Sequence, residues 1–381
     1  MVKSMYAAVA GLRTHQAKMD VIGNNIANVN TFAFKKARAA FRDQFYATMR
    51  GSTEAGNVYG GGNPSQVGYG SSLHSVDVDF GTASGAPTGN GMDAMINGNG
   101  FFMVGAFDPT GYATMSNIYE LESAAGTDPL EIMKSLTSLY YTRVGIFNVD
   151  GQGNFVDSAR NYVYGYSINP ATGKPGSELY DSTAGDPLRL EVLTVPWAYF
   201  DENGRIVTDA AGKAIRVSWT IQAGPPTFYE IDTTSADPLT AGPSGKVADG
   251  TGAPAEGVYI APMKLTNISI GDDGIIVGVY QDTEEVITIG QIVIADVPNP
   301  NALENTVNGY YKAKKNTGVI TAEVPGEGST GQLTAGRLEM ANVDLAQEFT
   351  EMITTQRGFQ ANGRIITVTD EMLAELVNLK R

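Results

Sequence analysis

Apolar residues near the start of the chain recur at spacings of three and four over about Val2 to Ala27. The members of this series are Met5, Val9, Leu12, Gln16, Met19, Ile22 and Ile26, of which Gln16 is the single polar one. Such spacing places side chains along one face of a helix, as in a heptad seam. The pattern therefore predicts a helix from about Val2 to Ala27 with a narrow apolar face.

The same spacing returns near the end of the chain and predicts a second, longer helix. Its members are Leu345, Phe349, Met352, Gln356 and Phe359, followed by Ile366, Leu373 and Val377. A helix of about 35 residues is roughly 50 Å long at 1.5 Å per residue. Helices of this length with a narrow seam need a partner along their length, and the obvious partner of each is the other.

Four glycines, Gly11, Gly23, Gly358 and Gly363, lie inside these two helical patterns. Each costs up to ~1 kcal/mol relative to Ala in a helix, and small residues also permit close approach of a neighbouring helix. Close packing and simple tolerance both remain open for these positions.

Between the helices the apolar period switches to two, as in Leu73, Val76, Val78 and Phe80. Short runs of this kind recur to about residue 300 and are bounded by glycine-rich turns, which is typical of antiparallel strands. The 45 glycines, 17 prolines and 18% charged residues favour such a turn-rich body. The fold class is α+β, with the terminal helices paired as a coiled-coil-like inner layer and nested, mainly antiparallel β domains between them.

The ends of the chain are expected to meet, which divides the sequence into four nested parts. Residues 1–30 with 341–381 form the helical part, and 31–70 with 325–340 form a connecting region. Residues 71–168 with 264–324 form a middle β domain. Composition becomes richer in Pro, Gly and Asp near Asn169, which predicts an inserted outer β domain over 169–263.

Composition removes most catalytic chemistry. The chain has no cysteine and only two histidines, His15 and His74, so thiolate catalysis, disulfides and cysteine-based zinc sites are excluded. We predict no catalytic residue, no cofactor and no metal site. No apolar run approaches a membrane span, and Arg13 and Lys18 interrupt the first 20 residues, so we expect no cleaved signal peptide and no membrane insertion.

Charge is distributed unevenly along the chain. Residues 1–50 hold eight basic and two acidic residues, a net charge of +6, whereas residues 338–381 hold four basic and seven acidic ones, a net charge of −3. The whole chain carries −15. Opposite signs favour association of the two ends, and the acidic middle disfavours nucleic acid as a partner.

Several motifs imitate ligand sites and fail on spacing. GDDG at Gly271 and DGQGNFVD at Asp150 lack the ligand order of a calcium loop, so turns between strands are the better interpretation. Trp197 and Trp219 are the only candidates for an aromatic cleft, which a secreted adhesin or carbohydrate-active β protein would need. Core packing is the simpler interpretation of both.

The stretch GNNIANVNTFAFKK, at Gly23 to Lys36, places four asparagines at the end of the first helix. Asparagine is a poor helix former because its amide competes for nearby backbone groups. These side chains therefore either terminate the helix or form hydrogen bonds to something outside it.

The two ends of the chain carry motifs of a known family. NNIANVNTFAFKK and, near the other end, EMANVDLAQEFTEMITTQRGFQANGRIITVTDEML resemble the paired terminal signatures of bacterial flagellar rod and hook proteins. NGNGFFMV, YYTRVGIFNVDGQGNFVD and IGQIVIADVPNPNALE also resemble that family's shared β domain. The resemblance covers most of the chain except about 170–262, and its length and insertion make it most similar to the hook subunits.

The resemblance implies a non-enzymatic structural subunit of the flagellum. Such a subunit is exported unfolded, without a cleaved signal, through the flagellar type III apparatus, and forms a helical homopolymer outside the cell. For a hook, that polymer is a short, flexible, curved tube that transmits motor torque to the filament. Its partners would be other copies, rod proteins, the hook cap and the hook–filament junction proteins; a straight distal rod protein is the nearest alternative.

The polymer interface implied by the resemblance lies in the two terminal motifs and in the first helix. Its residues would be Leu12, Gln16, Met19, Asn24, Asn25, Ile26, Asn28, Asn30, Thr31, Phe34 and Lys35, with Asn342, Val343, Asp344, Phe349, Met352, Gln356, Arg357, Gln360 and Asn362. One departure is visible: Phe32 and Ala33 stand where the family usually has Gly, often after Pro. Because Ala resists positive φ, we expect the turn after Thr31 to adopt a different geometry.

Overall fold

The computed structural model describes residues 2–54, 60–105, 139–151, 153–167, 190–193, 195, 197–200, 216–217, 259–281 and 286–379. These residues belong to two compact units. The terminal unit comprises Met1–Ala83 and Met340–Arg381, and the body unit comprises Ser84–Glu339. Most of the predicted outer domain, 169–263, lies outside the described residues, including Trp219 and the side chain of Trp197.

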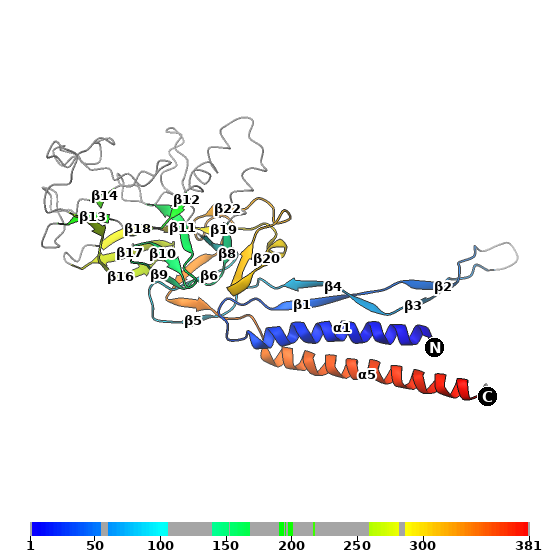
Figure 1. The fold of residues 1–381 in the computed structure, drawn as a ribbon. Helices are drawn as coiled ribbons and strands as arrows, with labels where there is room; N and C mark the ends of the chain where they lie inside the picture. Colours follow the sequence, from blue (N-terminus) through cyan, green and yellow to red (C-terminus); the bar gives the residue numbers. More distant parts are fainter. Residues whose placement is uncertain are drawn as a thin grey trace. The chain divides into compact units, whose positions relative to one another are not determined.

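The terminal unit contains two long helices and a pair of antiparallel ribbons (Figure 1). Helix α1 spans Val2–Ala27 and helix α5 spans Leu345–Asn378, so the prediction of two terminal helices that pair with each other is confirmed. Helix α5 begins where the carboxylate of Asp344 accepts hydrogen bonds from the backbone N–H groups of Ala346 and Gln347, at 2.9 and 3.3 Å. This cap satisfies donors that have no partner within the helix.

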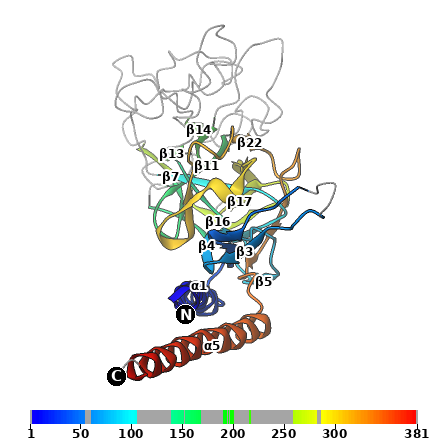
Figure 2. The same ribbon diagram turned by 90° about the vertical axis from the view of Figure 1, so that its right-hand side faces the viewer.

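The ribbons follow α1 directly in the chain. Strand β1 (Ala37–Asp43) pairs antiparallel with β4 (Ser71–Val78), and β2 (Tyr46–Arg50) pairs with β3 (Ser65–Gly68). Figures 1 and 2 show α1 lying between the ribbon of β1 and β4 on one side and α5 on the other. The chain lies close to α1 just before β4, at Gly70. A Cβ atom there would lie 3.1 Å from the Ala7 backbone, and Gly70 also has φ of +108°.

The body unit is built from short strands, and every described strand pair in it is antiparallel, as the sequence predicts. Its largest sheet contains, in order, β16 (Leu265–Ile270), β17 (Ile275–Tyr280), β18 (Val286–Ile292), β11 (Tyr162–Ser167), β7 (Phe101–Gly105), β8 (Tyr140–Thr142), β21 (Tyr310–Lys312) and β20 (Glu304–Asn305). Branches of this sheet are β9 (Phe147–Val149), β10 (Phe155–Asp157), β12 (Leu190–Val192), β19 (Ile294–Asp296) and β22 (Thr321–Glu323).

Smaller sheets and two short helices make up the rest of the described part of the body unit. Strand β5 (Gly85–Pro87) pairs with β24 (Arg337–Glu339), β6 (Ala94–Asn97) pairs with β23 (Gln332–Ala335), and β13 (Trp197–Phe200) pairs with β14 (Arg216–Val217) and β15 (Tyr259–Pro262). The 3-10 helices are η2 (Pro300–Ala302) and η3 (Val307–Gly309).

The core of the body unit is apolar and tightly packed. Phe102 and Phe147 meet edge to face with their ring centroids 5.1 Å apart, next to buried Ile276, Ile292 and Ile294. Aromatic side chains contribute large buried areas in such cores, and edge-to-face pairs add to their stability. The described strands of this unit therefore have an apolar core of their own.

One buried ion pair lies inside the body unit. Nη1 of Arg143 is 3.5 Å from a carboxylate oxygen of Glu339, Nη2 donates to the carbonyl of Gly98 at 2.8 Å, and both side chains are almost inaccessible. Burial lowers the pKa of Arg143, which the charge of Glu339 partly offsets. The guanidinium also lies 5.3 Å from the ring centroid of Phe101.

Two strand groups lie in units other than those the sequence suggested. Strand β4 was expected in the middle β domain but pairs with β1 in the terminal unit. Strands β23 and β24 were expected in the connecting region but pair with β6 and β5 in the body unit. The chain therefore changes unit at residues 83 and 339.

The motifs that resemble calcium loops are turns, as predicted. GDDG connects β16 to β17, and DGQGN connects β9 to β10. No helix among the described residues is both long and apolar enough to cross a membrane.

Candidate functional site

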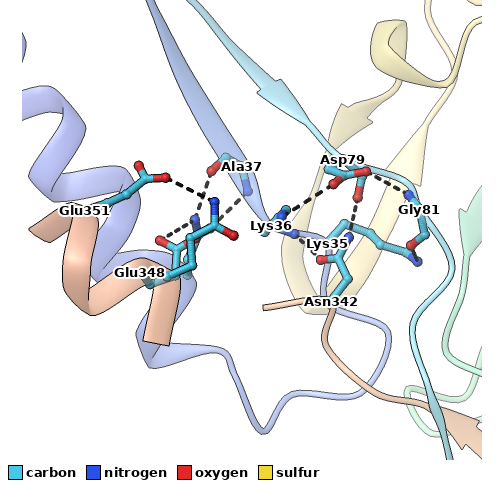
Figure 3. Close-up of polar contacts among 10 residues, drawn as sticks. Lys35, Lys36, Ala37, Asp79, Gly81, Asn342, Glu348 and Glu351 are labelled. Carbon is cyan, nitrogen blue, oxygen red and sulfur yellow. Dashed lines mark hydrogen bonds and ion pairs between the residues drawn. The ribbon is translucent and has the colours of Figure 1, made fainter. Parts of the chain in front are cut away.

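The side chain of Asn25 is buried and holds one residue of the neighbouring ribbon. Its Nδ2 donates to the carbonyl of Ala37 at 2.9 Å, and its Oδ1 accepts from the backbone N–H of Ala37 at 3.0 Å (Figure 3). Nδ2 also donates to Oε2 of the buried Glu348 at 3.2 Å. Only 1% of Asn25 is exposed, so this side chain of α1 takes the place of water as the hydrogen-bond partner of polar groups in β1 and α5.

Asn342, close to the other end of the chain, binds Lys36, the residue before Ala37, and also a residue of the next segment. Its Oδ1 accepts from the backbone N–H of Lys36 at 2.7 Å, and its Nδ2 donates to the carbonyl of Asp79 at 2.8 Å. Its own backbone N–H donates to the carbonyl of Phe34 at 3.3 Å. Two amides from opposite ends of the sequence thus hold consecutive residues, and we refer to this set, Asn25, Asn342 and their partners, as the amide junction.

Charged side chains surround the amide junction (Figure 3). Lys35 is 3% exposed and its Nζ donates to the carbonyl of Gly81 at 2.9 Å, while Lys36 lies 3.8 Å from the carboxylate of Asp79. Farther along the helices, Lys18 forms an ion pair of 3.0 Å with Glu351. The hydrogen bond from Lys18 holds the pKa of Glu351 below its usual range.

The turn after α1 is stabilised by its own side chains. Nδ2 of Asn28 donates to the carbonyl of Asn24 at 2.9 Å, and the hydroxyl of Thr31 donates to Oδ1 of Asn28 at 3.2 Å. Ala33 is buried with φ of +58°, inside the left-handed region that favours glycine. The expectation that Ala33 avoids positive φ is therefore wrong, and the turn holds this alanine in a strained conformation.

Helices α1 and α5 approach each other at two of the four glycines. A Cβ on Gly11 would lie 2.6 Å from Nδ2 of Asn362, and one on Gly358 would lie 2.7 Å from the ring of His15. Gly23 and Gly363 have nothing within 4 Å of that position. Close packing thus explains Gly11 and Gly358 but not the other pair.

The apolar face of α5 is only partly the face that meets α1. The buried residues of α5 are Glu348, Thr355 and Thr369, whereas Leu345, Phe349, Gln356 and Val377 of the predicted seam are exposed. The prediction that the seam as a whole packs on the other terminus is wrong for these four residues. A different face of α5 packs on α1, because Glu348 forms a buried hydrogen bond there and the small Gly358 allows close approach. The spacing of apolar residues does not indicate this face.

The predicted interface residues fall into three groups. Those with hydrogen bonds in the amide junction, the turn or the helix cap are Asn25, Asn28, Thr31, Phe34, Lys35, Asn342 and Asp344. Half-buried residues on the helices or beside them are Leu12, Met19, Ile26, Val343, Met352 and Asn362. Exposed residues are Gln16, Asn24, Asn30, Phe349, Gln356, Arg357 and Gln360.

The two terminal motifs do not reveal the partners of these side chains. Lys18, Asp79, Glu348 and Glu351 all contribute to the contacts described above. Glu348 could be recognised only weakly from the sequence, since acidic residues are common in the first turn of any helix, where they interact favourably with the helix dipole. The described residues contain no group of three or more His, Asp or Glu side chains able to hold a metal ion.

Comparison with known proteins places this junction in a known family. A family model described as "Flagella basal body rod protein" matches residues 5–35, and one described as "Flagellar basal body rod FlgEFG protein C-terminal" matches residues 334–379. The chain is 31% identical over 384 residues to the flagellar basal-body rod protein FlgG of Bacillus subtilis, covering 100% of both. The chain belongs to the flagellar rod and hook protein family.

Hook proteins are also among its relatives. The chain is 28% identical over 471 residues to the flagellar hook protein FlgE of Borreliella burgdorferi, again covering 100% of both. A crystal structure of the Helicobacter pylori flagellar hook protein FlgE2 matches with a TM-score of 0.33 and 9% identity, covering 67% of this chain and 100% of that one, which is too distant to add to the fold. Members of the flagellar rod and hook family are structural components of the flagellar basal body and hook, and the amide junction takes Asn25 from one of the two segments that the family models match and Asn342 and Glu348 from the other.

Proposed function

We propose that this chain is the structural subunit of a flagellar hook, assembling with copies of itself into a short curved tube that transmits torque. One observation supports polymerisation above all. Helix α5 meets α1 through a face that includes buried polar residues, and leaves a long series of apolar side chains exposed. Isolated apolar side chains on a surface are ordinary, but a contiguous series along one helix marks an interaction surface.

In the proposed polymer the exposed faces of α1 and α5 complete coiled-coil-like contacts with neighbouring copies. The predicted interface residues on these helices, including Gln16, Phe349, Gln356 and Gln360, would then lie between subunits. The amide junction would keep both ends of each subunit together where load passes from the helices to the ribbon. Of the four nested parts, the inserted outer domain over 169–263 stays a prediction, whereas the described strands divide into the terminal and body units.

The remaining partners follow from the proposed place in the flagellum. The subunit would leave the cell through the type III export apparatus without a cleaved signal and would contact rod, hook-cap and hook–filament junction proteins at the ends of the tube. It would carry out no catalysis.

A distal rod protein is the second candidate, and a specific observation favours it. The alignment with the rod protein FlgG spans 384 positions, hardly more than the 381 residues of the chain, whereas the alignment with the hook protein of Borreliella burgdorferi spans 471. The rod relative therefore aligns with fewer insertions.

The test is electron microscopy of the purified full-length chain under assembly conditions. We expect curved tubes. Straight, rigid tubes would identify the chain as a distal rod protein instead of a hook protein. A chain that stays monomeric at all concentrations would contradict both proposals.

A further inference from the structure

A groove runs along the side of α1 that faces the ribbon. Its volume is about 720 Å³, and residues of α1 such as Tyr6, Val9 and Arg13 form one wall, with Phe45 and Leu73 on the other. The hydroxyl groups of Thr14 and Ser71 lie 3.2 Å apart and connect the two walls. We refer to this feature as the α1 groove; its volume is within the ~300–1,000 Å³ typical of binding pockets.

The rim of the α1 groove is apolar and uncovered. Tyr6 is 59% exposed, Phe45 is 85% exposed and Leu73 is also exposed. Two large aromatic side chains in water beside a groove leave apolar area that a partner could bury, and aromatic residues at such places commonly dominate binding.

A row of apolar side chains lies on the last part of α5 and on Leu379, the residue that caps its C-terminal end. Its members are Ile365, Val368, Met372, Leu376 and Leu379, all exposed and separated by three or four residues. This spacing puts them on one face of the helix, and we refer to them as the terminal stripe. Helix α1 lies between α5 and the ribbon (Figures 1 and 2), and none of the residues that line the α1 groove belongs to α5 of the same subunit.

Charge selects this stripe from the apolar residues exposed elsewhere on α5. Glu371 and Glu375 border the second half of the terminal stripe and are exposed, Arg364 is exposed at its start, and Arg13 is exposed in the α1 groove. Within the described part of the chain neither of the two glutamates nor Arg13 has an ion pair. The other exposed series, Leu345, Phe349 and Ile353, is preceded at the equivalent positions by Asp344, which caps α5, and by the buried Glu348, which accepts from Asn25, so these carboxylates already have partners within the subunit.

We propose that in the polymer the terminal stripe of one subunit seats in the α1 groove of a second copy, with Glu371 and Glu375 facing Arg13 of that copy. The inference rests on the proposed polymerisation and names the pair of surfaces that would make one of its contacts. Seating would cover Tyr6, Phe45 and Leu73 and would bring together the basic start of one chain and the acidic end of another.

Engineered cysteines test the contact directly, because the chain has none of its own. Chains carrying Leu73→Cys and chains carrying Met372→Cys are mixed, assembled and oxidised, and crosslinked peptides are identified by mass spectrometry. Disulfides need Cβ atoms within about 4.5 Å, so we expect 73–372 crosslinks between chains and none when Phe349→Cys replaces Met372→Cys. Tubes that form without 73–372 crosslinks would overturn the inference and leave the proposed function intact, whereas wild-type chains that form no tubes would overturn the proposed function and the inference with it.

Charge reversal provides a second test that does not depend on oxidation. We expect Arg13→Glu, or Glu371→Arg with Glu375→Arg, to slow tube growth about tenfold, and the three changes together to restore it. Arg38→Glu, an exposed position on β1 outside the groove, is the matched control for loss of positive charge. Equal slowing by Arg13→Glu and Arg38→Glu, with no restoration in the combined variant, would contradict the pairing.

Discussion

The two units of the protein differ in where they keep their apolar side chains. In the terminal unit the described buried apolar residues are Ala8, Ile22 and Ala33, and most of the buried side chains around them are polar. In the body unit a continuous apolar core is buried, and among its described residues the large exposed apolar side chains are Val286, Val307 and Val319. The other large exposed apolar side chains of the described residues belong to the terminal unit.

This difference separates two kinds of stability. The body unit buries its apolar area within one chain, which is the main source of folding free energy. The terminal unit fixes its segments by satisfying polar groups at the amide junction and leaves apolar area for association. Such a unit gains further stability only when copies bind, by mass action.

Deleting residues 1–28 should have the largest effect and should act on one unit only. Without α1 and Asn25, both the partner of α5 and the amide junction are lost, so we expect no polymer by electron microscopy. The body unit should keep its β signal in circular dichroism and a cooperative unfolding transition. Normal tubes from the shortened chain would show that the terminal unit is not the site of assembly.

Removing the buried cation of the body unit should be the most damaging single substitution. Arg143→Met leaves Glu339 buried without its ion pair, and we expect the free energy of unfolding to fall by about 3–5 kcal/mol. Urea denaturation measures this, with Arg337→Met, an exposed arginine in β24, as the control. A loss in Arg143→Met no larger than in the control would mean that the pair contributes little to the body unit.

The amide junction should respond to loss of one side chain. Asn25→Ala leaves Glu348 and both backbone groups of Ala37 short of a partner, and we expect a loss of about 2–3 kcal/mol in the stability of the terminal unit. Asn30→Ala, at an exposed position of the same motif, should change stability by less than about 0.5 kcal/mol. Hydrogen exchange of the α1 and β1 amides distinguishes the two, and equal protection in both variants would argue against the junction.

The four helical glycines offer a matched comparison of opposite sign. Gly358→Ala would place a methyl group against the ring of His15 and should lower thermal stability, whereas Gly363→Ala meets nothing and should raise it by up to ~1 kcal/mol through helix propensity. Thermal melts followed by the far-UV circular dichroism of the helices measure both changes. Stabilisation by both substitutions would show that α1 and α5 can move apart at no cost.

The ion pair between Lys18 and Glu351 should have the smallest effect, and the effect should depend on pH. The folded state lowers the pKa of Glu351, so its contribution is present above the ordinary glutamate pKa and is lost as the pH falls through the lowered one. Because both side chains are partly exposed, Lys18→Met should cost only about 0.5 kcal/mol at neutral pH. Chemical denaturation at neutral pH and near pH 3, roughly a unit below the glutamate value, measures the change; a difference that persists undiminished at the lower pH would rule out this ion pair as its source.

Much of the fold follows from local patterns in the sequence. The period of the apolar residues gives both terminal helices, including the bounds Val2–Ala27, and the antiparallel class of the strands. The asparagine cluster predicts a helix end or hydrogen bonds to other segments, and it provides both: Asn28 caps the turn while Asn25 reaches β1. Periodicity and amide chemistry are properties of short stretches, so they can be read without knowing the fold.

Contacts between distant segments were decided by tertiary structure. No local pattern shows that Asn25 and Asn342 hold Ala37 and Lys36, because their match requires the two ends of the chain to meet at one place. Nor does the apolar seam of α5 show which face meets α1, since close approach at Gly358 and the buried hydrogen bond of Glu348 outweigh the apolar residues beside them. The sequence by itself determined the elements and the family; three-dimensional packing decided which polar groups satisfy one another and which apolar residues remain free to bind another copy.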